Sequence, residues 1–330
     1  MINNDFVTES DLVIDPNYQS LYHWDNNQDA QGEIEILFST NNPELNIEML
    51  SVDLREGKYI NVGFTNDTTH PPFLCGVLEN QVDSNYVFEA KKGDQKTFSL
   101  KLKKIEDKKW NFIVVKEDPE NGLLDPKTMF CLFMVDEDKT MSSKNFKYLL
   151  ESSKMRFEPS MLVLGSILLQ NGYSNEGILL FRIAAEYYNS STAYLRLGSL
   201  LCYSELANMA LDYLIKSVEL GEEEGNYYLG ELYSPFSHSL SFPNKNSAKA
   251  LEYYKKYNDP LSYTAISTIY KNGDKDVHRD LKLSRRYLQM AEENEETPKK
   301  SNFISYSITA LITLATVSYI AYRIFKRKMK

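Results

Sequence analysis

Cysteine and histidine are the residue types in this chain that could supply a thiol nucleophile or ligands for a metal ion. The chain has the following three cysteines and four histidines: Cys75, Cys131, Cys202, His23, His70, His238 and His278. No two cysteines form a Cys-x-x-Cys pair, and the histidines lack the spacing of paired metal ligands. Each cysteine stands among apolar neighbours, so we interpret all three as small buried side chains in a reducing compartment.

No other motif offers catalytic chemistry. The sequence has no glycine-rich phosphate loop and no Gly-x-Ser-x-Gly nucleophile motif. We therefore predict that the chain is not an enzyme and needs no cofactor or metal, and an enzyme of unfamiliar type is the least favoured hypothesis. Apolar residues make up 42% of the chain, which is enough to bury a core, so the function should rest on folded elements that bind.

The charge of the chain is unevenly distributed. The formal net charge of −9 divides into −16 before residue 299 and +7 from there on, because no acidic residue follows Glu296. Nucleic-acid binding needs clustered basic residues on the folded body, so the acidic body excludes a nucleic-acid partner. The seven basic residues near the C-terminal end flank an uncharged segment, and they are Lys299, Lys300, Arg323, Lys326, Arg327, Lys328 and Lys330.

That uncharged segment has the length of a membrane span. From Ser301 to Tyr322 a helix would extend about 33 Å, close to the hydrocarbon thickness of a bilayer. A buried or amphipathic helix is the alternative, but the serines and threonines fall all round the helix and leave no apolar stripe. We expect a spacer at 295–302, a transmembrane helix at 303–322 and a basic tail at 323–330.

This segment predicts a tail anchor. The first residues lack the basic flank and apolar core of a secretory signal, so we expect the body to stay in the cytosol. The positive-inside rule favours the opposite orientation, but it acts on short loops and does not carry a folded body across. The predicted location is single-pass in a membrane, with the mitochondrial outer membrane favoured over the endoplasmic reticulum.

The N-terminal part has the pattern of a β-sandwich. Between about residues 20 and 115, apolar residues recur at every second position, as in Ile34, Ile36 and Phe38, and turn residues separate the runs. About seven strands are expected, near 21–25, 33–39, 46–54, 58–64, 73–80, 84–90 and 96–104, with 109–114 closing the unit. We predict a tail at 1–17 and an antiparallel sandwich at 18–127.

Four residues in this region give it a family resemblance. Tyr22 and Trp24 open a strand as the Y-x-W of CS domains does, Gly76 lies in a strand similar to the family's L-x-G-x-L, and Trp110 follows a similar terminal strand. Pro71-Pro72 and the residues after Trp110 look most like the NudC branch. The resemblance implies a compact seven-stranded sandwich in a co-chaperone or adaptor that works with the ninety-kilodalton heat-shock chaperone or with dynein-linked proteins. We interpret the four residues as structural.

A helical repeat follows a linker predicted at 128–158. Residues 161–169, 193–201 and 225–233 resemble one another, and their glycines, Gly165, Gly198 and Gly230, are 33 and 32 residues apart. A fourth copy at 263–270 has Ile266 in place of the glycine. A second helix should follow each copy, at 177–187, 207–220, 248–257 and 280–292. A period of this length with two helices predicts an α-helical solenoid over 159–294, in which glycine lets the helices approach closely.

The last copy, from Tyr270 to Glu292, resembles the Sel-type repeat, a relative of the tetratricopeptide repeat. That resemblance implies a surface for protein ligands. The pattern leaves open which of the many tyrosines pack inside and which line a groove. Our first hypothesis is a membrane-anchored scaffold or co-chaperone that recruits chaperone, client or dynein-linked proteins. The alternative is an organelle-shaping or tethering adaptor whose repeats bind the partner and whose sandwich is a spacer.

Overall fold

The structure of the protein is a computed structural model. It describes residues 20–24, 32–40, 45–66, 70–91, 97–106, 108, 110, 113–120, 122, 124–239 and 241–295. The chain divides into two compact units, Met1–Leu164 and Gly165–Lys330, and the boundary falls inside one helix. Each unit has a hydrophobic core of its own.

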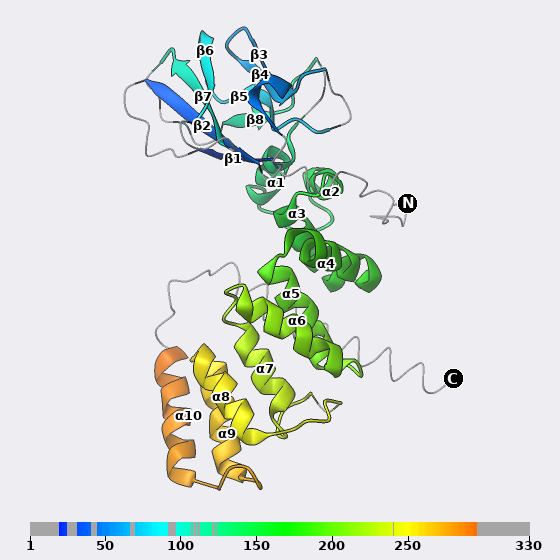
Figure 1. The fold of residues 1–330 in the computed structure, drawn as a ribbon, viewed down its shortest axis with the longest axis vertical. Helices are drawn as coiled ribbons and strands as arrows, with labels where there is room; N and C mark the ends of the chain where they lie inside the picture. The colour runs from blue at the N-terminus through cyan, green and yellow to red at the C-terminus, as the bar shows by residue number, and fades with distance from the viewer. Residues whose placement is uncertain are drawn as a thin grey trace, which may run out of the picture. The chain divides into compact units, whose positions relative to one another are not determined.

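The first unit contains two four-stranded antiparallel sheets (Figure 1). One sheet has the order β1 (Ser20–Trp24), β2 (Glu33–Thr40), β7 (Thr97–Lys104) and β6 (Val82–Ala90). The other has the order β3 (Leu50–Arg55), β4 (Tyr59–Phe64), β5 (Leu74–Leu78) and β8 (Val114–Lys116), and a short 3-10 helix, η3 (Ile47–Met49), precedes β3. The expected number of strands was about seven, whereas the described residues form eight.

The alternation of residue types explains how the two sheets face each other. Ile34, Ile36 and Phe38 of β2 are buried, while Glu33 and Glu35, which alternate with them, are exposed on the other side of the same strand. The apolar sides meet in one core, where the rings of Phe38 and Phe73 make an edge-to-face contact with centroids 6.4 Å apart.

Strand β6 lies at the edge of its sheet and is irregular. It pairs with β7, and the register shifts between Val82 and Tyr86, as at a β-bulge. Tyr86 and Val87 are exposed on this strand. The hydroxyl of Tyr86 donates a hydrogen bond to the carbonyl of Val52 in β3, at 3.0 Å, so the edge of one sheet is tied to the other.

Two short helices complete the first unit, and they lie almost entirely in the stretch 128–158 that was predicted as a linker. These are α1 (Pro126–Met134) and α2 (Phe146–Lys154), which pack against each other. Asp125 caps α1, and Pro126 stands at its first position, where a missing N–H costs nothing. Met129 and Leu132 of α1 pack on the sandwich core, so this helix extends that core.

The second half of the chain is built of helix pairs, which confirms the predicted helical repeats. The helices are α3 (Glu158–Gln170), α4 (Ser174–Tyr188), α5 (Ser191–Cys202), α6 (Ala207–Glu219), α7 (Gly225–Tyr233), α8 (Ser247–Tyr257), α9 (Pro260–Asn272) and α10 (Leu281–Glu295). Ser190, Asn246 and Asp259 cap helix starts with their side chains. Asn189 and Asn258 end helices in the left-handed conformation.

One part of the predicted fold class is wrong. Among the residues that the structure describes, no helix is long and apolar enough to cross a membrane. The longest of them, α4 and α10, have 15 residues, short of the roughly 20 that a span requires. The predicted span at 303–322 lies outside the described residues, as do its flanks Lys299, Lys300, Arg323, Lys326, Arg327 and Lys328. The location inferred from that segment stays a prediction.

Candidate functional site

The residues that resemble the CS signature lie in the sandwich. Tyr22 is buried, and its hydroxyl lies 3.2 Å from the Thr128 hydroxyl. Trp110 is fully buried, and Trp24 pairs with Ile36 across the β1–β2 ladder. Gly76 has φ of 139°, and a Cβ there would lie 2.5 Å from Val114 Cγ1, so no other residue fits. Tyr22, Gly76 and Trp110 therefore lie inside the unit.

A buried carboxyl group joins the sandwich to helix α1. Asp125 is fully buried and accepts hydrogen bonds from the Thr128 amide at 2.8 Å, the Thr128 hydroxyl at 2.6 Å and the Cys75 amide at 3.2 Å. Burial raises the pKa of this carboxyl from 3.8 to about 6, although the three donors oppose that shift. Because every donor comes from the protein itself, Asp125 holds α1 against β5.

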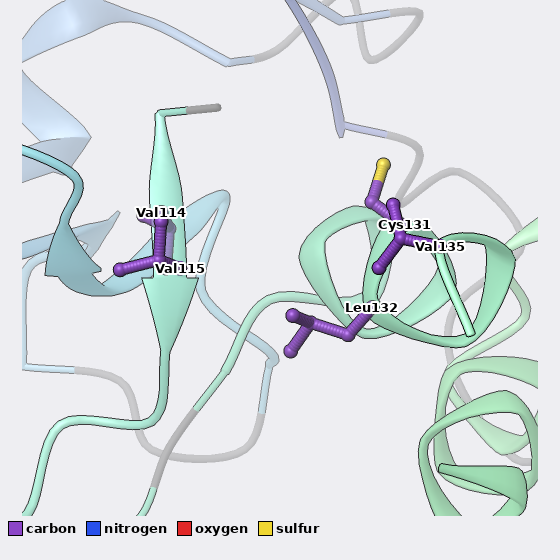
Figure 2. A pocket seen from close by; sticks show the side chains of 5 residues that line it. All are labelled: Val114, Val115, Cys131, Leu132 and Val135. Atoms are coloured by element: carbon purple, nitrogen blue, oxygen red, sulfur yellow. The ribbon is translucent and has the colours of Figure 1, made fainter. Parts of the chain in front are cut away.

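An apolar cavity of about 160 Å³ opens beside this helix. Figure 2 shows Val114 and Val115 of β8 on one side and Cys131, Leu132 and Val135 on the other. Its size is comparable to that of apolar cavities that hold a small hydrocarbon. The lining offers no charged group, so the cavity suits one apolar side chain or a small apolar molecule.

The thiols are poorly suited to nucleophilic chemistry. All three cysteines are free, and Cys75 and Cys202 are buried. Burial raises the pKa of Cys75 to about 12, and it also raises the pKa of Cys131 and Cys202. A protonated thiol is a weak nucleophile. Within the described ranges, no group of three or more His, Cys, Asp or Glu residues could hold a metal ion.

The repeat glycines lie where two helices of a pair touch. A Cβ on Gly198 would lie 2.6 Å from Leu214 Cγ on α6, and one on Gly230 would lie 2.5 Å from the ring of Tyr254 on α8. At Gly165 the nearest atom, on Phe181, would be 3.1 Å away, so this crossing is slightly looser. Substituting any of the three forces a packed side chain to move.

A second buried carboxyl group, which the sequence did not reveal, lies among the tyrosines of the repeats. Glu231 of α7 is 6% exposed and accepts hydrogen bonds from Tyr254 of α8 at 2.6 Å and from Tyr203 at the end of α5 at 3.3 Å. Burial raises the pKa of Glu231 and of both tyrosines. The carboxyl group therefore joins three helices from two successive pairs.

Comparisons with known proteins give only distant likenesses. No protein-family model matches the sequence, and no curated protein matches it. Among solved structures, a Sel1 repeat protein from Oxalobacter formigenes is similar, with 23% identity over 51% of this chain and 73% of that chain, and a TM-score of 0.41. The protein c5321 is a protective antigen of uropathogenic Escherichia coli strains that displays an SLR fold. It has 18% identity over 51% of this chain and 38% of that chain, and its TM-score is also 0.41.

Proposed function

We propose that this chain is a protein-binding scaffold whose helical repeats hold a protein ligand. The observation that supports this most directly is the series of helix pairs α3–α4, α5–α6, α7–α8 and α9–α10, with glycine at three of the crossings. Repeats of this kind contact mainly their neighbours and leave an extended surface, which such proteins use to bind other proteins. The helices also carry exposed apolar side chains, such as Met209 of α6 and Leu261 of α9, which a protein ligand can cover.

In this proposal the N-terminal sandwich is a second binding module with a co-chaperone role. Support comes from the CS-like residues Tyr22, Gly76 and Trp110, which lie inside a two-sheet unit as that resemblance implies. The partners expected from the resemblance are a chaperone, its client or a dynein-linked protein. The apolar cavity beside α1 adds a place for one apolar side chain of such a partner.

Site-specific photo-crosslinking in the full chain tests the proposal. A photoreactive residue replaces Met209 in the repeats or Val87 in the sandwich, each about half exposed. We expect light-dependent adducts with other proteins at both positions, and with a chaperone, client or dynein-linked protein at Val87. Adducts at Met209 but not at Val87 would mean that the sandwich is a spacer and that the repeats alone bind the partner. The absence of adducts at both positions would contradict the scaffold.

A further inference from the structure

Helix α10 is the last described helix of the helix pairs, and it packs against α9 (Figure 1). Ser267 of α9 donates a hydrogen bond to the carbonyl of Ser284 at 2.8 Å, and the rings of Tyr270 and Tyr287 stack with centroids 6.0 Å apart. Ala291, about two turns along from Ser284, is 4% exposed. These contacts fix which side of α10 faces α9 and which side faces away from it.

A line of four exposed residues runs along another side of α10. Leu281 and Leu288 are 44% and 45% exposed, and they lie on one face of the helix because seven residues make about two turns. Arg285 and Glu292 are also exposed and continue the line at a spacing of three and four residues. We call Leu281, Arg285, Leu288 and Glu292 the α10 stripe. One exposed leucine is ordinary on a protein surface, but the outer helix of a repeat array normally presents a polar face.

The charges of α10 are sorted along its length. Lys282, Arg285 and Arg286 lie in its first half, and Glu292 and Glu293 lie near its end. The helix dipole favours the opposite order, with acidic side chains at the start and basic ones at the end. This order of charges therefore does not stabilise the isolated helix, and it requires another explanation.

Within α10 these charges find no partners of opposite sign. On α4, α6 and α8, opposite charges three or four residues apart pair along the helix. These pairs are Arg182–Glu186, Lys216–Glu219 and Glu252–Lys256. Helix α10 has no opposite charges at those spacings. Arg285 and Glu292 stand about 10.5 Å apart along the axis, too far to pair in one helix. Neither forms an ion pair with any residue that the structure describes.

A second copy of α10, running antiparallel across a two-fold axis beside Leu288, accounts for both features. Arg285 of each copy then lies opposite Glu292 of the other, because the midpoint of these two positions falls next to residue 288. The two Leu288 side chains meet between the two ion pairs and leave water. The start of each helix lies beside the end of the other, so the helix dipoles attract. The surface therefore complements itself, as a two-fold interface requires.

We propose that two copies of the chain pair through the α10 stripe. A nucleic acid or an anionic lipid surface would suit one sign of charge, whereas the stripe carries both signs in an order that its own reversed copy matches. A contact made by one helix is smaller than the roughly 800 Å² per partner of a stable interface, so the pairing should be weak and reversible. Pairing goes beyond the proposed binding function of the repeats, because it makes the scaffold bivalent.

Exchange of the two charges in the full chain tests this inference. Sedimentation velocity over a series of protein concentrations should show a reversible monomer–dimer equilibrium for the unsubstituted protein. Arg285→Glu or Glu292→Arg alone places like charges opposite each other and should raise the dissociation constant about tenfold. The double variant, Arg285→Glu with Glu292→Arg, restores two opposite pairs and should restore dimerisation. Both positions are exposed, so the thermal midpoint should not change.

Glu252→Lys is the matched control for the change in net charge. Glu252 is exposed on α8, where it pairs with Lys256, so this reversal should leave the dissociation constant of the dimer unchanged. Equal weakening by Glu252→Lys and by Glu292→Arg would mean that net charge alone governs the association, and it would overturn the inference.

A disulfide across the proposed axis gives an independent readout. Leu288→Cys should form a disulfide-linked dimer under mild oxidation, because the axis brings the two residues 288 together. Gln289→Cys is exposed one position along and turned about 100° away, so it should not. Both substitutions are placed in a Cys131→Ser background, since Cys75 and Cys202 are buried and Cys131 is partly exposed.

The outcomes are separate from those that test the scaffold. A monomer at every concentration, no rescue in the double variant, or equal cross-linking from residues 288 and 289 would overturn the pairing. Coverage of the stripe by another protein or by residues after 295 would leave Leu288→Cys unlinked and would also overturn it. Rescue in the double variant, together with no adduct at Met209 or Val87, would support the pairing and contradict the scaffold.

Discussion

Tyr254 of α8 donates a hydrogen bond to the buried carboxyl group of Glu231 on α7, with 2.6 Å between the two oxygens. The same ring lies against Gly230, where a Cβ would be 2.5 Å from it. The ring of Tyr254 thus fills the space that Gly230 leaves, and its hydroxyl donates a hydrogen bond to Glu231, the next residue along α7. Packing and polar satisfaction at this crossing depend on one tyrosine.

Removing that hydroxyl should destabilise the helical unit. Tyr254→Phe leaves Glu231 with Tyr203 as its remaining hydroxyl donor, so we expect the free energy of unfolding to fall by about 1–3 kcal/mol. Urea titration followed by circular dichroism measures the loss. Tyr253→Phe, which changes a neighbouring tyrosine stacked on Tyr233, should cost less than about 0.5 kcal/mol. Equal losses in the two variants would show that the hydrogen bond from Tyr254 to Glu231 makes no specific contribution to the free energy of unfolding.

Gly198→Ala separates helix propensity from packing. Alanine is the better helix former by about 1 kcal/mol, so propensity alone predicts a gain in stability. A Cβ at this position would lie 2.6 Å from Leu214, so we expect a net loss of about 1–3 kcal/mol in urea unfolding. Asn208→Ala, at an exposed position of α6, is the control and should be neutral or slightly stabilising. A stabilised Gly198→Ala protein would refute the close crossing.

The stability of the first unit should fall as the pH rises toward the pKa of the Asp125 carboxyl group. Its carboxyl has a folded pKa of about 6 against 3.8 as the ordinary value, so the folded state binds the proton more tightly. The stabilisation is complete below about pH 4 and is lost by about pH 6, a change of roughly 2–3 kcal/mol. Asp125→Asn should remove this dependence of stability on pH. The free energy of unfolding is measured for the unsubstituted protein and for the variant between about pH 4 and pH 6, and the difference between the two should change across that range. A constant difference would contradict the raised pKa.

We expect Arg55 to stabilise the first unit mainly through its ion pair with a buried carboxylate and only weakly through its ion pair with an exposed one. It forms ion pairs with Asp118, which is 1% exposed, and with Glu120, which is 73% exposed. Arg55→Met leaves the buried Asp118 carboxylate without its cationic partner, so the free energy of unfolding should fall by about 3 kcal/mol. Glu120→Gln should lower it by less than about 1 kcal/mol. Denaturant unfolding of the two variants makes the comparison. Similar losses would mean that the pair with Asp118 is no stronger than a surface contact.

The helix pairs were predictable because their signals are local. The apolar period and the spacing of Gly165, Gly198 and Gly230 depend on neighbouring residues, and the second helices begin close to where the pattern placed them. The alternation of apolar residues likewise indicated the strands of the sandwich. Most of helix α1 was assigned to a linker and its first two residues to the sandwich, although Asp125 followed by Pro126 is a helix-start signal.

The buried carboxyl groups could not be found in this way. The bond from Cys75 to Asp125 joins residues 50 apart, and those from Tyr203 and Tyr254 to Glu231 span 28 and 23 residues. Such contacts are created by the packing of the chain, and nothing in the local pattern marks them. The same limit applied to the tyrosines: Tyr228 and Tyr254 proved buried, whereas Tyr187 is half exposed.

The irregular edge strand β6 has a consequence for how copies of the protein meet. A straight, open edge is a template on which another chain can add a strand, and repeated addition leads to fibres. The shift between Val82 and Tyr86 breaks the even row of backbone groups, and the Tyr86 hydroxyl holds the edge back toward Val52. Although Val87 is exposed, this edge is therefore a poor template for a strand added by another copy of the protein.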